Sequence, residues 1–143
     1  MHMQYNPFLI FGAILSAIAA ALHIGIVAKG APWYRFFGAG EVFATAAEQK
    51  KLWPHLATLA IAIVLFVWSA YALSGAGLLR PLPYLQFALL AITGIYLLRG
   101  AALFPLLAFS RDKVTPFIIW SSSICLLFGA VHAVGLVQVW HRL

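Results

Sequence analysis

Acidic side chains and cysteine are nearly absent from this sequence. Its 143 residues contain three Asp or Glu and one cysteine, Cys125. A single cysteine excludes a disulfide within the chain and a metal centre built from several thiolates. The three acids, Glu41, Glu48 and Asp112, all lie outside the long apolar runs. A transport mechanism that depends on a carboxylate inside the membrane is therefore excluded as well.

Apolar residues dominate what is present: 64% of the chain is hydrophobic, 8% is charged, and the mean hydropathy is +1.00. This composition predicts an integral membrane protein, because a helix needs about 20 apolar residues to cross roughly 30 Å of hydrocarbon. The net charge of +6 comes mostly from basic residues in the connections between apolar runs. Basic residues in such places contact lipid headgroups, so we expect membrane lipids as partners and no nucleic acid.

Four apolar segments have spanning length, at about 8–28, 53–74, 82–104 and 114–140. Short connections force neighbouring segments to run antiparallel. We therefore expect an all-α fold in which residues 1–143 form a single domain, an antiparallel bundle of four transmembrane helices. Segment 8–28 has the apolar core of a secretory signal, but nothing basic precedes it and it is long enough to span. We therefore expect a transmembrane helix there and not a cleaved signal.

Basic residues in the connections set the expected orientation. Six lie in the first and third connections and two on the opposite side, namely Lys29, Arg35, Lys50, Lys51, Arg111 and Lys113 against Arg80 and Arg142. The positive-inside rule then predicts that the first and third connections are cytoplasmic and that both termini lie outside. The expected location is a plasma membrane of the bacterial inner-membrane type.

The connection between the first two segments is unusually aromatic. Residues 32–37 read Pro-Trp-Tyr-Arg-Phe-Phe, and a stretch rich in glycine and alanine follows. Such a segment is too apolar for a free aqueous loop, so we expect it to lie in the interface or to re-enter the membrane, with a short helix from about Glu41 to Lys51. Trp33 and Tyr34 are expected at headgroup level as a lid, next to Arg35.

Small and polar residues share one stripe of each apolar segment, at spacings of three and four residues. Helix contacts in lipid have this pattern, so the stripes are predicted to face one another. The stripes are Gly12, Ser16, Ala19 and His23; His55, Thr58, Ala62 and Ser69; Gln86, Thr93, Tyr96 and Gly100; and Ser122, Cys125, Gly129 and His132.

Three cationic or titratable side chains are predicted at one depth. At about 1.5 Å per helical residue, His23 lies just before the end of the first segment and His55 just after the start of the second. Arg99 is expected at the same end, with Tyr96 one turn away and Glu41 as the nearest acid. A charge at that depth normally faces the interior with a partner. The plainer alternative is that Arg99 reaches the interface as an anchor and that both histidines are satisfied core residues.

A second polar layer is expected toward the other side of the membrane. His132 lies about 18 residues into the last segment, too far along to share a centre with His23. We expect it to pair with Gln86 or Ser69.

The first functional hypothesis is binding or transport of a small anionic or amphipathic, lipid-like ligand. Arg99 would be the fixed cation, Glu41 its partner or a proton acceptor, and Tyr96 an orienting hydroxyl. Eight residues are predicted to line the site: His23, Trp33, Tyr34, Arg35, Glu41, His55, Tyr96 and Arg99.

Two alternatives from other classes stay open. One is a membrane enzyme or redox carrier in which His23 and His55 ligate a haem, or together with Glu41 hold a divalent metal. The other is a structural or accessory subunit whose small-residue stripes form a homodimer or dock a larger partner. The residues alone name neither a reaction nor a cofactor, and they leave open whether the protein is an enzyme.

Overall fold

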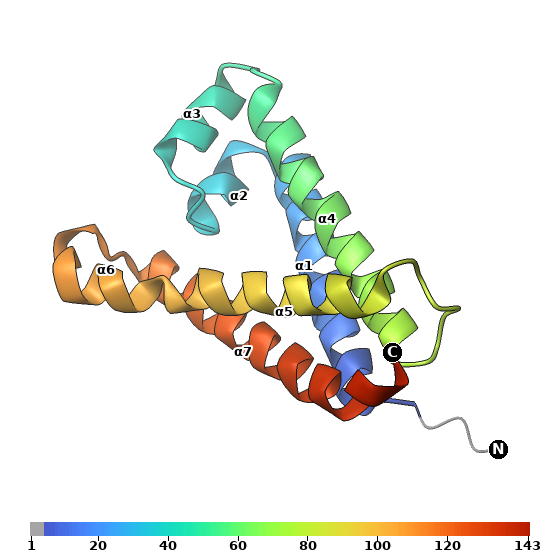
Figure 1. Ribbon diagram of the computed structural model, residues 1–143. Helices are drawn as coiled ribbons and strands as arrows, with labels where there is room; N and C mark the ends of the chain where they lie inside the picture. The colour runs from blue at the N-terminus through green and yellow to red at the C-terminus, as the bar shows by residue number, and fades with distance from the viewer. Residues whose placement is uncertain (1–4) are drawn as a thin grey trace. The chain divides into compact units, whose positions relative to one another are not determined.

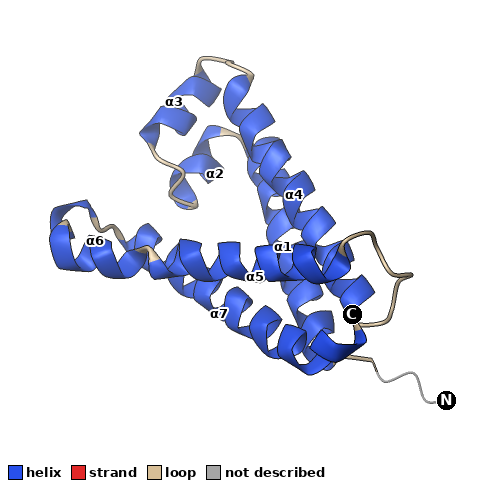
Figure 2. Cartoon of the chain, viewed as in Figure 1, coloured by secondary structure: helices blue, strands red, loops and turns tan. Residues whose placement is uncertain are grey.

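The fold is that of a computed structural model, which describes residues 5–143 (Figure 1). In chain order the α-helices are α1 (Pro7–Lys29), α2 (Ala31–Phe36), α3 (Glu41–Glu48), α4 (Trp53–Gly75), α5 (Leu85–Ala101), α6 (Leu103–Phe109) and α7 (Pro116–Val139). Short 3-10 helices, Arg111–Lys113 and Trp140–Arg142, flank α7. The described residues otherwise form loops, and no strand occurs among them (Figure 2). The predicted all-α class is confirmed.

Four helical segments are long and apolar enough to cross a membrane: Pro7–Lys29, Trp53–Gly75, Leu85–Phe109 and Pro116–Arg142. They confirm four apolar helices of spanning length at the predicted places, with bounds that differ by a few residues at the ends. On these helices large apolar side chains remain on the surface, and Val137 is 75% exposed. Soluble proteins rarely expose such continuous apolar surface, so the four helices indicate a membrane protein.

The third span shows the largest shift from the prediction, and prolines explain it. Two prolines keep residues 81–83 out of the helix, because the residue before a proline avoids the helical conformation. Pro105 lacks the N–H that would bond to the carbonyl of Ala101, and the helix is interrupted at Ala102. It continues as α6, so the span extends to Phe109.

The structure consists of two compact units. One comprises residues 16–67 and contains α2 and α3; we call it the α2/α3 unit. The other comprises residues 5–15 and 68–143 and contains α5, α6 and α7; we call it the α5/α7 unit. Helices α1 and α4 each contribute residues to both units. That residues 1–143 form a single domain stays a prediction.

Matching turns end α2 and α3 within the α2/α3 unit. The N–H of Gly38 donates to the carbonyl of Arg35, and the N–H of Lys50 donates to that of Ala47, both at 3.0 Å. In each turn the next N–H donates to the carbonyl one residue further back, which is the Schellman pattern. The pattern needs a left-handed residue, and φ is 68° at Gly38 and 56° at Lys50. The predicted helix at Glu41 therefore ends at Glu48, before Lys51.

A small apolar core holds the α2/α3 hairpin against α1. Its buried members are Ile26, Ala31, Tyr34 and Ala44. Helix α2 was not predicted as a separate element; Pro32 in its first turn favours the helical start. That this hairpin lies in the interface or re-enters the membrane stays a prediction.

Helices α5 and α7 pack antiparallel along a pair of reciprocal glycines (Figure 1). A Cβ atom built on Gly100 would lie 2.8 Å from the backbone nitrogen of Leu126, and one on Gly129 would lie 3.0 Å from that of Leu97. Because the later residue of α5 meets the earlier residue of α7, the two helices run in opposite directions. Glycine lets the backbones approach this closely, as in other helix contacts within membranes.

Asn6 fastens the start of α1 inside the α5/α7 unit. Its side-chain oxygen accepts a hydrogen bond from the N–H of Leu9 at 2.8 Å and so caps the helix. Its Nδ2 donates to Gln138 on α7 at 2.8 Å, and its backbone N–H donates to the carbonyl of Ala76 at 3.1 Å. The apolar core beside it consists of Leu9, Ala76, Leu89, Leu136 and Val139.

Most residues of the predicted polar stripes are buried. The buried ones are Gly12, Ser16, Thr58, Ala62, Ser69, Thr93, Tyr96, Gly100, Ser122, Gly129 and His132. The half-buried ones are Ala19, His23, His55, Gln86 and Cys125. The stripes therefore identify the interior faces of the helices in both units.

Candidate functional site

A directed chain of hydrogen bonds joins α2 to α4 within the α2/α3 unit. The hydroxyl oxygen of Tyr34 lies 3.2 Å from both His55 Nδ1 and Thr58 Oγ1, and the Thr58 hydroxyl donates to the Pro54 carbonyl at 2.8 Å. The only hydroxyl hydrogen of Thr58 is used on Pro54, so Tyr34 donates to Thr58. His55 then donates from Nδ1 to Tyr34, and its Nε2 is the nitrogen left to meet a ligand.

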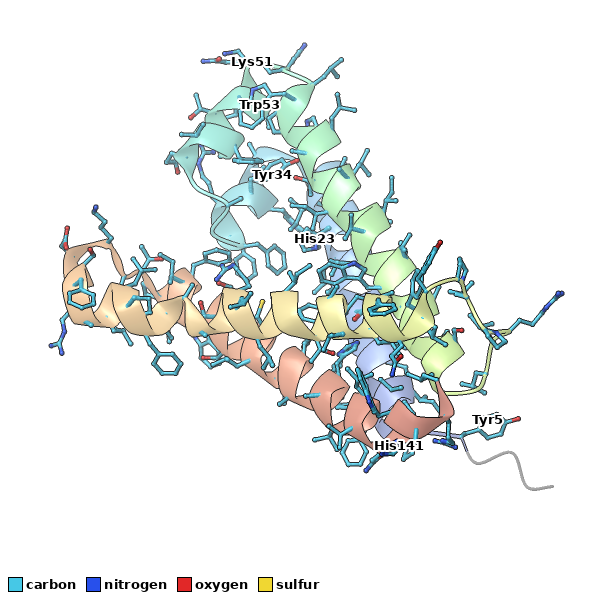
Figure 3. All side chains as sticks on the ribbon, in the orientation of Figure 1. Tyr5, His23, Tyr34, Lys51, Trp53 and His141 are labelled. Atoms are coloured by element: carbon cyan, nitrogen blue, oxygen red, sulfur yellow. The ribbon has the colours of Figure 1, made fainter. Side chains whose placement is uncertain are left out.

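Tyr34 is buried and joins α2 to α4. That it forms part of an interfacial lid stays a prediction. It reaches from α2 toward α4 and is 1% exposed, with its ring 5.7 Å from that of His55 (Figure 3). Because its hydroxyl finds partners, the whole side chain can be buried. Trp33 is half-buried and lies against α1, where a Cβ atom on Gly25 would approach its ring to 3.0 Å.

Arg35 neutralises two of the three acids of the sequence. Its Nε donates to both carboxylate oxygens of Glu41, at 3.0 and 3.1 Å, and its Nη1 donates to Glu48 at 2.6 Å. The hydrogen bonds to Glu48 and Glu41 raise the pKa of Arg35 further above its ordinary value. The bond from Arg35 lowers the pKa of Glu48. The predicted pairing of Glu41 with Arg99 would join residues of different units and stays a prediction.

The two predicted histidine ligands each have one nitrogen engaged. His23 donates from Nδ1 to the carbonyl of Ala19 at 2.7 Å, as His55 does to Tyr34. Among residues 5–143, no three His, Cys, Asp or Glu side chains are grouped so that they could hold a metal ion. The structure therefore does not bring His23, Glu41 and His55 together as metal ligands. Haem ligation by the two histidines stays a prediction.

A shallow cavity of about 380 Å³ lies in the α2/α3 unit. It is formed by one face of α3 and by the turn into α4, where Lys51 and Trp53 lie (Figure 3). Of the eight predicted ligand residues it includes Glu41, whose carboxylate already accepts from Arg35. This cavity is therefore not the predicted ligand site, because Glu41 is the one predicted residue that lines it.

Arg99 lies in the α5/α7 hairpin, where it bonds to neutral partners. Its Nη1 donates to Ser122 Oγ at 3.1 Å and its Nη2 donates to Ser121 Oγ at 3.2 Å. Ser122 is fully buried, whereas Arg99 is exposed. Within the α5/α7 unit no carboxylate pairs with Arg99. Two of its five N–H groups are therefore held by hydroxyls, and the other three are left for a further acceptor.

Arg99 lies far from the start of α5, whereas its two serine partners lie near the start of the antiparallel α7. It lies about 21 Å along α5 from Leu85, and the two serines lie about 8 Å into α7 from Pro116. Both helices belong to apolar spans. The α5/α7 unit contains one acidic residue, Asp112, against five basic residues. A cation is thus fixed inside apolar helices in a unit of strongly positive charge.

Tyr96 belongs to a buried aromatic layer one turn from Arg99. Its ring centroid lies 5.0 Å from that of Trp68, 5.4 Å from Phe128 and 5.3 Å from His132. Tyr96 therefore packs against α4 and α7. Its predicted role as an orienting hydroxyl stays a prediction.

His132 is fully buried, and the prediction that it pairs with Gln86 or Ser69 is wrong. It donates from Nδ1 to the carbonyl of Phe128 in its own helix at 2.8 Å, and Ser69 donates to the carbonyl of Ala13. Its Nε2 has no hydrogen-bond partner among the described residues. The ring lies against Gly12, where a Cβ atom would be 2.7 Å from Cε1.

The structure divides the eight predicted site residues between its two units. The α2/α3 unit contains His23, Trp33, Tyr34, Arg35, Glu41 and His55, and the α5/α7 unit contains Tyr96 and Arg99. Together the helices and these sites define an all-α protein with four helices suited to span a membrane and a cationic site in one helical hairpin. Comparisons with protein-family models, with curated proteins and with solved structures find no match.

Sequence reasoning missed the partners of Arg99. The signal for them is a run of three hydroxyl residues, 121–123, inside an apolar segment. Two of these hydroxyls meet Arg99, and Ser123 instead donates to the carbonyl of Ile119 in its own helix. Which serine faces α5 depends on the register of the two helices, which the sequence pattern does not give.

Proposed function

We propose that the protein binds a small anionic amphiphile, of the kind present in lipid bilayers, at Arg99 in the α5/α7 hairpin. The observation that supports this function is the set of partners of the guanidinium within the α5/α7 unit: two serine hydroxyls and no carboxylate. A headgroup with a phosphate or carboxylate would supply the missing negative charge.

The free energy of a hydrogen bond to an anionic headgroup is similar in size to the cost of a charge inside a transmembrane helix. A cation at the centre of a transmembrane helix costs about 2.5–3.5 kcal/mol. A hydrogen bond to a charged group contributes about 1.5–3 kcal/mol. One anionic headgroup bound to Arg99 would thus offset much of the cost of holding the cation in an apolar span.

The geometry of the partners favours an anion with two oxygens. A guanidinium is a planar fork that binds carboxylate or phosphate through two parallel hydrogen bonds. Ser121 and Ser122 hold both terminal nitrogens of Arg99 and so fix the plane of the fork. The remaining N–H groups then present a fixed edge to a ligand that approaches from the surface of the hairpin.

The same proposal includes a location in a bacterial plasma membrane, with the α1–α4 and α6–α7 connections cytoplasmic. Its support is the distribution of basic residues between the connections. The test is labelling with a membrane-impermeant maleimide in intact cells, on Cys125→Ser variants that carry either Ala39→Cys or Leu78→Cys. Labelling of the second alone is expected; labelling of the first alone would reverse the orientation.

The binding test compares two variants that lose the same charge. Arg99→Gln removes the proposed ligand group, and Arg111→Gln removes an exposed guanidinium whose Nε donates to the carbonyl of Leu107. Purified protein is titrated with phosphatidylglycerol or phosphatidylcholine, and bound lipid is counted by native mass spectrometry. Loss of a charged hydrogen bond should lower the affinity of Arg99→Gln for phosphatidylglycerol about tenfold or more, and Arg111→Gln should change it less than about twofold.

Two further variants test the geometry. Arg99→Lys keeps the charge but loses the fork, so its affinity should fall between those of the native protein and Arg99→Gln. Replacing Ser121 and Ser122 together by alanine should weaken binding while leaving the charge in place. Equal affinity of Arg99→Gln and Arg111→Gln would refute the proposal. In that case a visible absorption band would favour the haem alternative, and its absence with a stable dimer would favour the structural subunit.

A further inference from the structure

The cavity in the α2/α3 unit combines charges of both signs with an aromatic wall. Its volume of about 380 Å³ falls within the range of sites that bind one small molecule. All of its lining residues come from α3 and the turn into α4, with Glu41 at one end of this segment and Lys51 and Trp53 at the other. One short stretch of the chain therefore forms the whole cavity.

Packing and a backbone hydrogen bond fix the wall at the turn into α4. The ring of Trp53 packs edge-on against Phe43, with centroids 4.8 Å apart, and Phe43 in turn lies 5.9 Å from the buried ring of Tyr34. The backbone N–H of Lys51 donates to the carbonyl of Ala46 at 2.9 Å and closes the turn after α3. The Trp53 indole and the Lys51 side chain therefore extend from an ordered backbone (Figure 3).

Four polar side chains in the cavity have hydrogen-bonding capacity left for a ligand. Thr45, Gln49, Lys51 and Trp53 make no side-chain hydrogen bond or ion pair with residues 5–143. Lys51 offers a positive charge and three N–H donors, and the Trp53 indole offers one N–H. These donors suit the oxygens of a phosphate group, which accepts charge-assisted hydrogen bonds.

Glu41 places a negative charge at the other end of the cavity. Its carboxylate accepts from Arg35 at 3.0 and 3.1 Å, but Arg35 also donates to Glu48, so one positive charge serves two carboxylates. The Glu41 side chain is 71% exposed, and a carboxylate can accept about four hydrogen bonds. Glu41 can therefore accept further hydrogen bonds from a cationic group of a ligand.

Apolar side chains beside the cavity indicate where the ligand comes from. Val42 is 73% exposed and Leu52 is 72% exposed, next to Lys51 and Trp53. Apolar, tryptophan and lysine side chains occur together at the level of lipid headgroups. We propose that the cavity binds the headgroup of a phospholipid with a primary amine, of the phosphatidylethanolamine type, with its phosphate at Lys51 and Trp53 and its ammonium group at Glu41.

The ammonium group distinguishes this ligand from other zwitterionic lipids. Ethanolamine has a primary ammonium with three N–H donors, whereas the trimethylated nitrogen of choline has none. Glu41 can form a hydrogen bond to the first and not to the second. The site at Arg99 belongs to the α5/α7 unit and needs only an anion, so the present inference does not rest on it.

The test measures lipid binding to purified protein in detergent micelles by native mass spectrometry. The native protein should bind phosphatidylethanolamine about tenfold more tightly than phosphatidylcholine, which corresponds to one charged hydrogen bond. Water-soluble phosphoethanolamine should bind about tenfold or more weakly than the lipid. Equal affinity for the two lipids would overturn the inference, and phosphoethanolamine bound as tightly as the lipid would overturn the assignment to a membrane lipid.

One pair of variants tests the ammonium end. Glu41→Gln and Glu48→Gln each remove a carboxylate that accepts from Arg35, but Glu48 does not line the cavity. Glu41→Gln should lower the affinity for phosphatidylethanolamine about tenfold, to that for phosphatidylcholine, and Glu48→Gln should change it less than about twofold. Equal effects of the two substitutions would overturn the inference.

A second pair tests the phosphate end. Lys51→Gln should lower the affinity for both lipids about tenfold, because both contain the phosphate, whereas Lys50→Gln should change it less than about twofold, because Lys50 does not line the cavity. Thr45→Trp, at an exposed position of α3, should fill the cavity and abolish the preference for phosphatidylethanolamine. Equal effects of Lys51→Gln and Lys50→Gln would overturn the inference. Arg99→Gln should leave the preference unchanged whether or not the site at Arg99 exists.

Discussion

Replacing Gly100 by alanine should weaken the packing of α5 on α7, whereas the same replacement at Gly94 should not. A Cβ atom on Gly100 would lie 2.5 Å from Leu126 Cγ and 2.8 Å from its backbone nitrogen. A backbone atom cannot move aside as a side-chain tip does, so the helices must separate. At Gly94, also within α5, no atom lies within 4 Å of the added Cβ. The pair therefore isolates the effect of helix contact from that of helix propensity.

Overpacking and helix propensity change the free energy of unfolding in opposite directions. Overpacking a well-packed contact typically costs about 1–3 kcal/mol. Alanine is favoured over glycine inside a helix by about 0.5–1 kcal/mol. Gly94→Ala should therefore gain about 0.5–1 kcal/mol, and Gly100→Ala should lose up to about 2.5 kcal/mol net. Gly129→Ala should behave like Gly100→Ala, because Leu97 lies against it in the same way.

The assay is equilibrium unfolding in mixed micelles with increasing SDS, followed by circular dichroism. The expected order of midpoints is Gly94→Ala highest, the native protein next, and Gly100→Ala and Gly129→Ala lowest. Chemical cross-linking in the micelles confirms that the oligomeric state is the same for all variants. If Gly100→Ala unfolds at the midpoint of Gly94→Ala, the close approach of α5 and α7 does not exist.

Three further changes test the α2/α3 unit. Tyr34→Phe removes the hydroxyl between buried Thr58 and half-buried His55 and should cost about 1–3 kcal/mol in the same unfolding assay. An unchanged midpoint would refute the hydrogen-bond chain. Lys50→Gly relieves the left-handed backbone strain and should stabilise the protein by about 0.5–1 kcal/mol, and a loss of stability would contradict the φ of 56° at Lys50. Because the pKa of Glu48 is lowered, its bond to Arg35 stabilises the fold above the ordinary glutamate pKa of about 4.3 and is lost as the pH falls through the lowered value. A carboxyl NMR titration of the native protein should give a Glu48 pKa below about 4.3. In Arg35→Gln the Glu48 pKa should rise to about 4.3. The same Glu48 pKa in both proteins would show that the pair does not form.

The spans could be predicted from the sequence because apolar runs of this length have few other structures available. The small and polar stripes also identified the buried faces, since their spacing matches the helical period. The third span was less accurate because its ends depend on three prolines, of which Pro105 interrupts a helix without ending the apolar segment. Helix α2 is six residues long, too short for periodicity to reveal.

The site could be predicted in part. Arg99 stood out because a charge inside an apolar run is costly wherever it lies. The burial of Tyr34 was not predicted, because an aromatic residue beside Trp33 and Arg35 also fits the interfacial belt. What buries it is a pair of partners 21 and 24 residues later, and such contacts leave no periodic signal. The unpartnered Nε2 of His132 was missed for a similar reason, since its ring lies against residues of α1 and α5.

The most direct measurement for the central claim is the distance between Arg99 and a lipid phosphate. Protein with ¹⁵N-labelled arginine in phosphatidylglycerol bilayers allows ¹⁵N–³¹P dipolar couplings to be recorded by solid-state NMR, and comparison with Arg99→Lys assigns the signal of Arg99. The account predicts a coupling at hydrogen-bond contact distance that disappears in Arg99→Lys and survives in Arg111→Gln. A guanidinium signal of Arg99 without any coupling to phosphorus would contradict it.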